Sequence, residues 1–173
     1  MTDVLAWPGA EPIETERLLL EPLHVGHADE MVTVLDDERL HAFIGGRPLA
    51  LPELRDRYAR LALGRSPDGT QGWLNWVVRD VGSGHAAGTV QATLWRDRDG
   101  LVAEIAWVTG TAYQGRGYAK EAAVAMVAWL RQHGVTVFVA HVHPAHDASI
   151  GVARHLGLTA TDTVVDGEVR WTG

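Results

Sequence analysis

The sequence contains no cysteine, and lysine occurs only once, at Lys120. The absence of cysteine excludes a disulfide framework, a catalytic thiol and zinc–thiolate sites. There are 15 basic residues against 22 acidic ones, with no basic run, and the formal net charge is −7. Because nucleic-acid backbones are bound by clustered lysine and arginine, we expect no nucleic-acid partner. An acidic surface favours a cationic ligand such as an amine, and solubility alone explains it equally well.

Long apolar runs are also missing, since none approaches the roughly 20 residues needed to cross a bilayer. Residues 1–10 lack the charged-then-apolar pattern of a signal peptide. We therefore expect a cytoplasmic protein that does not contact a membrane. The 173 residues, 46% hydrophobic and 21% charged, match one globular domain with a proper core. We expect an N-terminal arm over 1–12, a single domain over 13–173 and no internal repeat.

Two glycine signatures for nucleotides are absent as well, namely G-x-x-x-x-G-K-[ST] and G-x-G-x-x-G followed by a distant acidic residue. A different glycine-rich stretch, Gln-Gly-Arg-Gly-Tyr-Ala at 114–119, follows a strand-like run and opens a long apolar helix. The first N–H groups of a helix lack intrahelical partners and, with the macrodipole, attract phosphate. Glycine lets the backbone approach such a ligand closely. An ordinary helix start after a glycine-rich turn explains the same residues equally well.

Hydrophobic periodicity and turn residues predict a mixed order of strands and helices. The expected strands cover 13–23, 73–79, 86–95, 101–109, 135–142, 158–165 and 168–171. The expected helices cover 27–36, 51–63, 120–133 and 147–155. Short turns, one of them with an Asp-Gly pair, link the three central strands into an antiparallel meander. The apolar strand after the long helix suits a parallel neighbour, which gives a right-handed βαβ unit.

Two separated blocks resemble the GNAT family of N-acetyltransferases. Residues 114–119 match the family pattern Gln/Arg-x-x-Gly-x-Gly/Ala, which holds a pyrophosphate. Residues 142–149 (Val-His-Pro-Ala-His-Asp-Ala-Ser), followed by Leu-Gly-Leu at 156–158, are similar to the block Pro-x-Asn-x-x-Ser and Leu-Gly-Phe. The opening Glu-Thr-Glu-Arg-Leu-Leu-Leu-Glu-Pro-Leu looks like the first strand of the branch that includes ribosomal-protein N-terminal acetyltransferases.

The resemblance covers 13–171 and implies a GNAT-type α+β fold. We expect a mixed, mostly antiparallel central sheet of about seven strands, flanked by about four helices. The family's sheet splays between its fourth and fifth strands, which are 101–109 and 135–142 here. The thioester of acetyl-coenzyme A lies in that gap in the family.

The implied reaction transfers the acetyl group of acetyl-coenzyme A, as co-substrate, directly to a primary amine. No enzyme nucleophile is needed, in agreement with the absence of cysteine. The branch resemblance suggests a protein N-terminus as acceptor, and a small-molecule amine is as plausible. One alternative is a GNAT-fold module that binds acyl-coenzyme A without turnover, and another is an unrelated nucleotide-binding protein. The expected partners are acetyl-coenzyme A and the amine, the expected state is a monomer or homodimer, and no metal is expected.

The resemblance also assigns cofactor contacts. The strand end would pair through its main chain with the pantetheine arm, the glycine-rich stretch would hold the pyrophosphate, and the second block would lie near the thiol. The residues concerned are Trp107, Val108, Thr109, Gln114, Gly115, Arg116, Gly117, Tyr118, Ala119, His146 and Ser149.

Three residues are candidates for catalysis. Glu104 is the candidate base, acting through water, because a lone acid in an apolar strand is costly unless it is solvated or paired. A solvent-facing position on the outer side of the sheet accounts for it as well. Ser149 matches the family serine near the thiol, or is a helix first-turn residue. His146 replaces the usual asparagine and is a candidate cofactor contact or acid, since Ala153 occupies the position of the usual tyrosine acid.

Several aromatic residues and histidines have open roles. His141 and His143 form an H-x-H-x-x-H pattern with His146, which suits a metal, a polar lining of the acceptor site or ordinary strand histidines. Phe43 and Tyr58 are candidates for acceptor contact or for packing. The tryptophans are expected mainly in the core or at a subunit contact, and three of them on the meander are the best candidates to line a pocket. The tryptophans are Trp7, Trp73, Trp76, Trp95, Trp107, Trp129 and Trp171, and the three on the meander are Trp73, Trp76 and Trp95.

Overall fold

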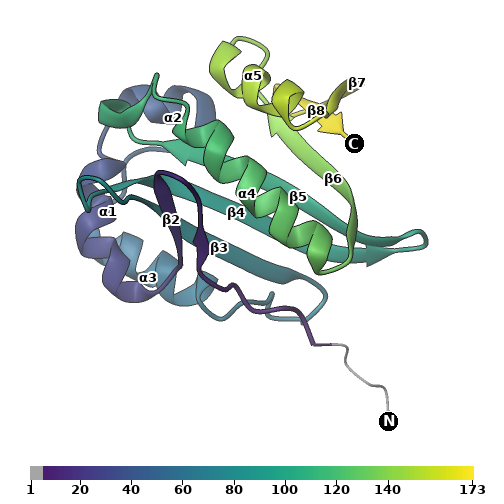
Figure 1. Ribbon diagram of the computed structural model, residues 1–173, viewed down its shortest axis with the longest axis horizontal. Helices are drawn as coiled ribbons and strands as arrows, with labels where there is room; N and C mark the ends of the chain where they lie inside the picture. Colours follow the sequence, from purple (N-terminus) through teal and green to yellow (C-terminus); the bar gives the residue numbers. More distant parts are fainter. Residues whose placement is uncertain (1–5) are drawn as a thin grey trace.

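The computed structural model describes residues 6–173 and is built around one eight-stranded sheet (Figure 1). The strand order is β1-β2-β3-β4-β5-β6-β8-β7. The strands are β1 (Ile13–Glu14), β2 (Leu18–Pro22), β3 (Gly72–Asp80), β4 (Ala86–Asp97), β5 (Gly100–Thr109), β6 (Val135–Val142), β7 (Thr159–Val165) and β8 (Glu168–Thr172). The helices are α1 (Ala28–Val34), α2 (Glu38–Ile44), α3 (Leu51–Leu61), α4 (Tyr118–Gln132) and α5 (Asp147–His155), with short 3₁₀ turns at Val25–His27 and Thr111–Tyr113. The predicted α+β architecture is confirmed, with one more strand and one more helix.

The long helix α4 packs across one face of the sheet (Figure 1). Alternate residues of the central strands, among them Leu74, Val90 and Ile105, meet the buried side of α4 at Met126 and Leu130. The alternation follows from the two-residue period of a strand, which sends neighbouring side chains to opposite faces.

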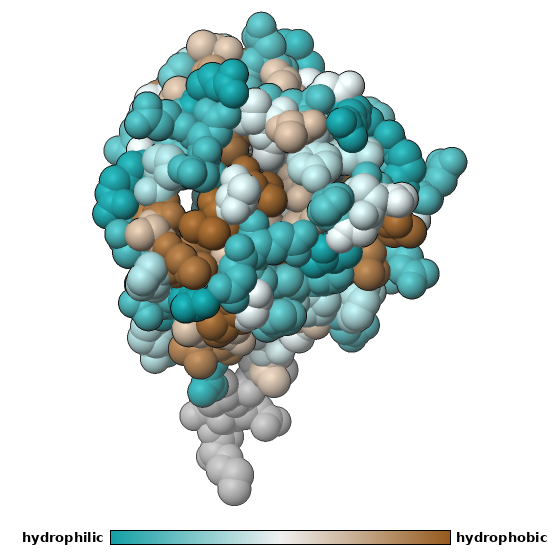
Figure 2. Space-filling view, turned by 90° about the vertical axis from the view of Figure 1, so that its left-hand side faces the viewer, coloured by the Kyte–Doolittle hydropathy of each residue, from teal (hydrophilic) through white to brown (hydrophobic). Residues whose placement is uncertain are grey.

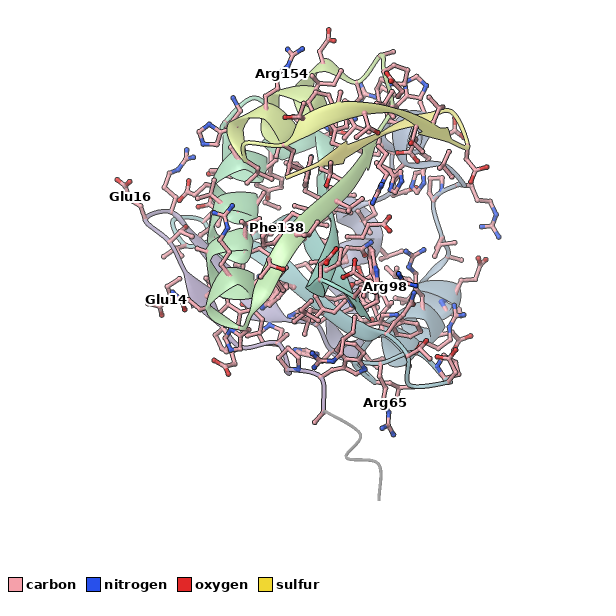
Figure 3. All side chains as sticks on the ribbon, turned by 90° about the vertical axis from the view of Figure 1, so that its right-hand side faces the viewer. Glu14, Glu16, Arg65, Arg98, Phe138 and Arg154 are labelled. Atoms are coloured by element: carbon pink, nitrogen blue, oxygen red, sulfur yellow. The ribbon has the colours of Figure 1, made fainter. Side chains whose placement is uncertain are left out.

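The C-terminal end of α4 leads directly into β6. Figure 3 shows Phe138 of β6 beside this helix, and its ring lies under the guanidinium of Arg131 at 5.3 Å. The strand–helix–strand unit predicted from the apolar run is therefore present, with β5 and β6 parallel.

The sheet divides at the contact between β5 and β6. The two strands pair only from Leu101↔Val135 to Glu104↔Val139. Beyond this point β6 pairs with β8, while β5 stays with β4 up to Gly88↔Thr109. The predicted splay between 101–109 and 135–142 is confirmed, and it leaves one edge of β5 without a strand partner.

Two sequence-based predictions for the N-terminal half were wrong. The segment 13–23 is two strands, because a turn at Thr15 closes on Leu18 and interrupts the pairing. No helix was expected between 36 and 51, and this stretch contains α2. Asp37 caps this helix by accepting a hydrogen bond from the Arg39 N–H at 2.9 Å, and Gly45 ends it at φ 80°. The helix is too short for its periodicity to stand out in the sequence.

The predicted arm over 1–12 lies partly outside the described residues, because the description begins at residue 6. The rest of this segment packs on the sheet as a surface lead-in. The Trp7 indole donates to the Gly69 carbonyl at 3.1 Å, and the Trp76 indole donates to the Glu11 carbonyl at 2.8 Å. Within residues 6–173, no helix has the length and apolarity that crossing a membrane requires.

Helices α1 and α3 cover the other face of the sheet over β3 and β4, where a second small core includes Met31, Leu54 and Val77. A charged network fastens α1 to the sheet. Arg79 of β3 donates to Glu21 of β2 and to Glu30 of α1, the latter from Nη1 to Oε1 at 3.1 Å. Hydrogen bonds from Arg79 are the main cause that lowers the pKa of both carboxyl groups below 4.5.

Removing this network should change how stability depends on pH. A carboxylate with a lowered folded-state pKa stabilises the fold above its unfolded pKa, and this contribution is lost as pH falls through the folded value. We predict that Arg79→Met lowers the free energy of unfolding by about 2 kcal/mol at pH 7 and weakens the acid destabilisation below about pH 4.5. Urea unfolding at several pH values measures both effects.

Arg55→Met is the matched control, because Arg55 pairs with Asp29 on the surface, where both side chains are about half exposed. Such pairs contribute little to stability. An unchanged acid dependence in Arg79→Met would show that this network does not couple stability to pH.

Candidate functional site

The turn between β5 and α4 presents a row of free main-chain amides. Gly115 and Gly117 both have positive φ, 77° and 78°, which is the left-handed region that favours glycine. Gly117 is the N-cap of α4 and provides no side chain to cap the helix. Among the described residues, none accepts a hydrogen bond from the N–H groups of 115–120. The predicted arrangement at the start of the helix is therefore present, and it suits an anion.

Arg17, in the turn between β1 and β2, holds this loop from outside. Its Nη1 donates to the Arg116 carbonyl at 2.9 Å, and its Nε donates to Glu121 at 2.7 Å. Its guanidinium also lies over the Tyr118 ring at 4.8 Å. Arg17 was not among the site residues predicted from the sequence, because its partners lie about a hundred residues away in the chain.

Two cavities adjoin each other, and one of them begins at this loop. The first, of about 580 Å³, runs from the amide row to the start of α5. The second, of about 500 Å³, lies between the sheet and helices α1 to α3. Figure 2, which views the molecule from the side of these helices, shows apolar side chains gathered around a hollow. Both cavities are lined by Phe43, Ile44, Trp107, Val108, His146 and Ser149.

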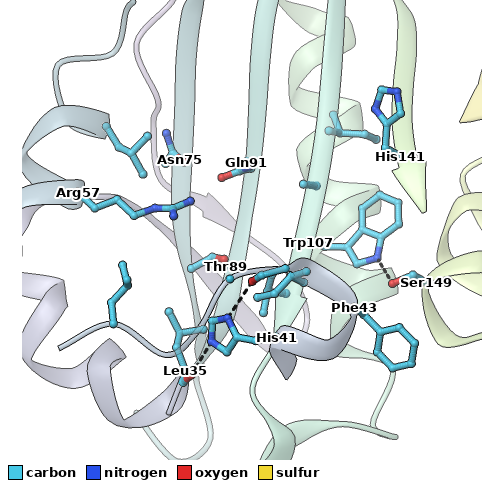
Figure 4. Close-up of a pocket in the computed structure, with 18 of the residues that line it drawn as sticks. Leu35, His41, Phe43, Arg57, Asn75, Thr89, Gln91, Trp107, His141 and Ser149 are labelled. Carbon is cyan, nitrogen blue, oxygen red and sulfur yellow. Dashed lines mark hydrogen bonds between the residues drawn. The ribbon is translucent and has the colours of Figure 1, made fainter. Parts of the chain in front are cut away.

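A hydrogen bond crosses the splayed sheet where the cavities meet. The Trp107 indole N–H of β5 donates to the Ser149 hydroxyl of α5 at 3.2 Å (Figure 4). No described residue accepts a hydrogen bond from that hydroxyl, so its proton can be donated to a ligand. The His146 ring stacks on Phe43, with centroids 4.3 Å apart, and so joins α5 to α2 over the same junction.

Glu104 lines the second cavity, and its side chain is 46% exposed. Its Oε1 is 3.1 Å from the Nδ1 of His141, at the last paired position of β5 and β6. Both residues were predicted separately from the sequence. Their pairing depends on the register between the two strands, which the sequence alone does not reveal.

The three histidines contact different partners. His141 binds Glu104, His143 accepts a hydrogen bond from the Ala145 N–H at 3.0 Å, and His146 stacks on Phe43. Within residues 6–173, no group of three or more side chains of metal-binding type is arranged to hold an ion. The geometry places His141 and His146 on the lining of the cavities.

Most of the other predicted site residues line the first cavity, and Arg116 and Ala153 do not. Gln114, Gly115, Gly117, Tyr118 and Ala119 line the first cavity together with Trp107, Val108 and Thr109. Arg116 is not one of the lining residues, and its guanidinium lies over the Tyr113 ring at 5.5 Å. Position 153 is a fully buried alanine in α5, and alanine has no hydroxyl to donate.

The aromatic residues are divided between the core and the cavities. Trp73 and Trp95 line neither of the two large cavities, whereas Trp76 lines the second one with a side chain that is closed to solvent. Trp107 is the tryptophan whose indole lies at the junction (Figure 4). Tyr58 lines the second cavity, with its hydroxyl buried and without a partner. Burial raises the pKa of Tyr58 to about 12.

The sequence matches the family model described as an acetyltransferase (GNAT) domain over residues 17–159. This chain therefore belongs to the GNAT acetyltransferase family. A search of curated proteins finds no match.

Solved structures of the family share the fold. A GNAT-family acetyltransferase from Bacillus anthracis is 17% identical, with a TM-score of 0.74 over 94% of this chain and 96% of that one. The ribosomal-protein acetyltransferase RimL, solved with coenzyme A, is 17% identical, with a TM-score of 0.76 over 94% and 97%. The GNAT domain of PAT from S. lividans is 21% identical, with a TM-score of 0.69 over 90% and 89%. These likenesses establish the fold.

Burial of His146 against Phe43 should be measurable by titration. Burial is the main cause that lowers the pKa of His146 below 6.5, and the neighbouring His143 adds to it. We predict a neutral His146 ring at pH 7 and, in Phe43→Ala, a pKa that returns toward 6.5. Histidine ring signals followed by NMR between pH 5 and 8 report both values. Ile44→Ala, which changes a neighbouring residue of the same lining, is the control, and an equal rise there would exclude stacking on Phe43 as the cause.

Proposed function

We propose that this enzyme transfers the acetyl group of acetyl-coenzyme A to a primary amine. The observation that carries the proposal is the row of free amides at 115–120, which opens on a cavity that ends at the splay. A pyrophosphate fits such a row, because its oxygens accept hydrogen bonds from N–H groups and its charge suits the positive end of the helix. Lys120, which also lines the cavity, adds positive charge.

The free edge of β5 is suited to the extended pantetheine arm. Main-chain groups of Trp107, Val108 and Thr109 lie beyond the last pair with β6, so they can pair with a ligand as with an added strand. The Thr109 carbonyl already accepts a hydrogen bond from the Gln114 side chain at 3.1 Å, which leaves fewer free acceptors at this end. Acetyl-coenzyme A supplies the thioester that is attacked.

Glu104 and His141 are proposed to take up the proton that the ammonium must lose before it attacks. An amine with a pKa of about 10 is mostly protonated at neutral pH, so a base is needed near the junction. The imidazole of His141 orients the carboxylate of Glu104. The carboxylate takes the proton from the amine either directly or through one water molecule. Ser149 is proposed to donate its free hydroxyl proton toward the departing sulfur, and His146 is the second candidate for this role.

The acceptor is proposed to be either a protein N-terminus or a small-molecule amine. The structural neighbour RimL is described as an acetyltransferase of the first kind, acting on a ribosomal protein. The second candidate function is a module that binds acyl-coenzyme A without turnover, which is favoured by the buried alanine at position 153. Release of free coenzyme A thiol in the presence of a panel of amines separates the two functions. The described residues of one chain form both cavities, and the enzyme is proposed to act as a monomer or a homodimer.

Filling the amide row should prevent cofactor binding. Gly117→Glu adds a side chain and a negative charge where the pyrophosphate is proposed to bind, and we expect the affinity for acetyl-coenzyme A to fall by at least about 100-fold. Isothermal titration calorimetry measures it. Gly134→Glu, at the other end of the same helix with φ 92°, carries the same type of backbone strain and is the control. Unchanged affinity in Gly117→Glu would refute the proposed cofactor site.

Replacing the proposed base should alter the pH–rate profile. We expect Glu104→Gln to lower kcat roughly 100-fold near pH 6 to 7, with a smaller loss near pH 9, where more of the amine is already unprotonated. Glu14→Gln is the control, because Glu14 is exposed on β1 and lines neither cavity. An unaltered profile in Glu104→Gln would dismiss this residue as the base.

A further inference from the structure

The second cavity has a cationic end away from the splay. Arg57 of α3 lines it, and Figure 4 shows its guanidinium directed toward Asn75 of β3. No described residue forms a hydrogen bond or ion pair with the Arg57 guanidinium. Other arginines of this region are paired: Arg47 with Glu53 and Arg55 with Asp29.

Two side-chain amides line the same cavity as this guanidinium. Asn75 of β3 and Gln91 of β4 are direct neighbours in the strand register, and both point into the cavity (Figure 4). Neither side chain forms a hydrogen bond with a described residue. An arginine fork and two amide NH₂ groups together offer several donors for one anionic group. A carboxylate fits this set, because arginine binds it in a bidentate manner.

The opposite end of the cavity is acidic. Glu104 of β5 and Glu168 of β8 line it beside the splay. Asn75 at the cationic end belongs to β3, Glu104 at the acidic end belongs to β5, and β4 lies between these two strands. The two ends of the cavity are therefore about two strand spacings apart, roughly 10 Å. The cavity is therefore complementary to a molecule with an ammonium group at one end and an anion at the other.

The wall between the two ends is apolar. Side chains of α3 and of the segments next to the helices cover this part of the cavity, among them Leu35, Leu49, Leu54 and Leu61. Such a wall suits an alkyl or similarly apolar chain that joins the two charged groups. The volume of about 500 Å³ is in the range of small-molecule sites.

We propose that the acceptor is a small zwitterionic amine whose carboxylate binds Arg57, Asn75 and Gln91 while its amine lies at the splay beside Glu104. The proposal rests on the proposed acetyl transfer and specifies its acceptor. The carboxylate and the amine are several bonds apart, as in an ω-amino acid. A free α-amino acid does not span the cavity, because both of its charged groups are attached to one carbon.

Matched pairs of acceptors test the proposal. We expect kcat/KM for 6-aminohexanoate and 8-aminooctanoate to exceed that for hexylamine and octylamine by about 10- to 100-fold, with leucine much poorer than either acid. In Arg57→Gln the ratio between acids and alkylamines falls toward one. In Arg60→Gln, which alters an arginine of the same helix that does not line the cavity, the ratio is retained. Equal use of acids and alkylamines by the unaltered enzyme would overturn the anionic subsite and leave acetyl transfer intact.

A binding measurement keeps the test independent of turnover. With coenzyme A bound, the N-acetylated acids should raise the melting temperature more than the N-acetylated alkylamines, and Arg57→Gln should abolish the difference. If the unaltered protein shows no such difference, the anionic subsite is refuted. This outcome is also the one expected if a peptide N-terminus is the true acceptor. Failure of acetyl-coenzyme A itself to shift the melting temperature would instead refute the proposed function.

Discussion

The end of the pairing between β5 and β6 is the constraint on which the rest of the site depends. Four pairs, from Leu101↔Val135 to Glu104↔Val139, join the strands before β6 turns to β8. The edge of β5 beyond this point keeps main-chain groups that need partners. Both large cavities reach this edge, so it is the place where a donor and an acceptor can meet.

Distant contacts hold the surroundings of this gap. Arg17 supports the glycine-rich loop from the first hairpin, with the Glu121 partner only 19% exposed. Thr111 donates to Asp37 at 2.7 Å, so the same turn is also fastened to the start of α2. The bond from Trp107 to Ser149 spans the two halves of the splayed sheet. These contacts hold the loop in place through side chains and a carbonyl group, and they leave its main-chain N–H groups free for a ligand.

The charge distribution at the site differs from that of the whole chain. The chain carries a formal charge of −7, yet unpaired positive groups lie at two positions on the cavities. The start of α4, with Lys120, offers one, and Arg57 offers the other. Acidic side chains lie between them at the splay. An alternation of this kind favours ligands whose own charges alternate in the same way.

Local sequence patterns determined most of the elements and the start of α4. The central meander, β6 and α5 follow from strand alternation, a continuous apolar run and turn residues, all of which act over a few neighbouring positions. The glycines at 115 and 117 predicted the row of free amides, because a glycine-rich turn before a helix is also a pattern of a few neighbouring positions. Only the tertiary structure decided that α2 forms a helix over the junction, that Glu104 meets His141, and that Arg17 and Arg57 belong to the site. Each of these depends on strand register or on packing between segments far apart in the chain, which no local pattern encodes.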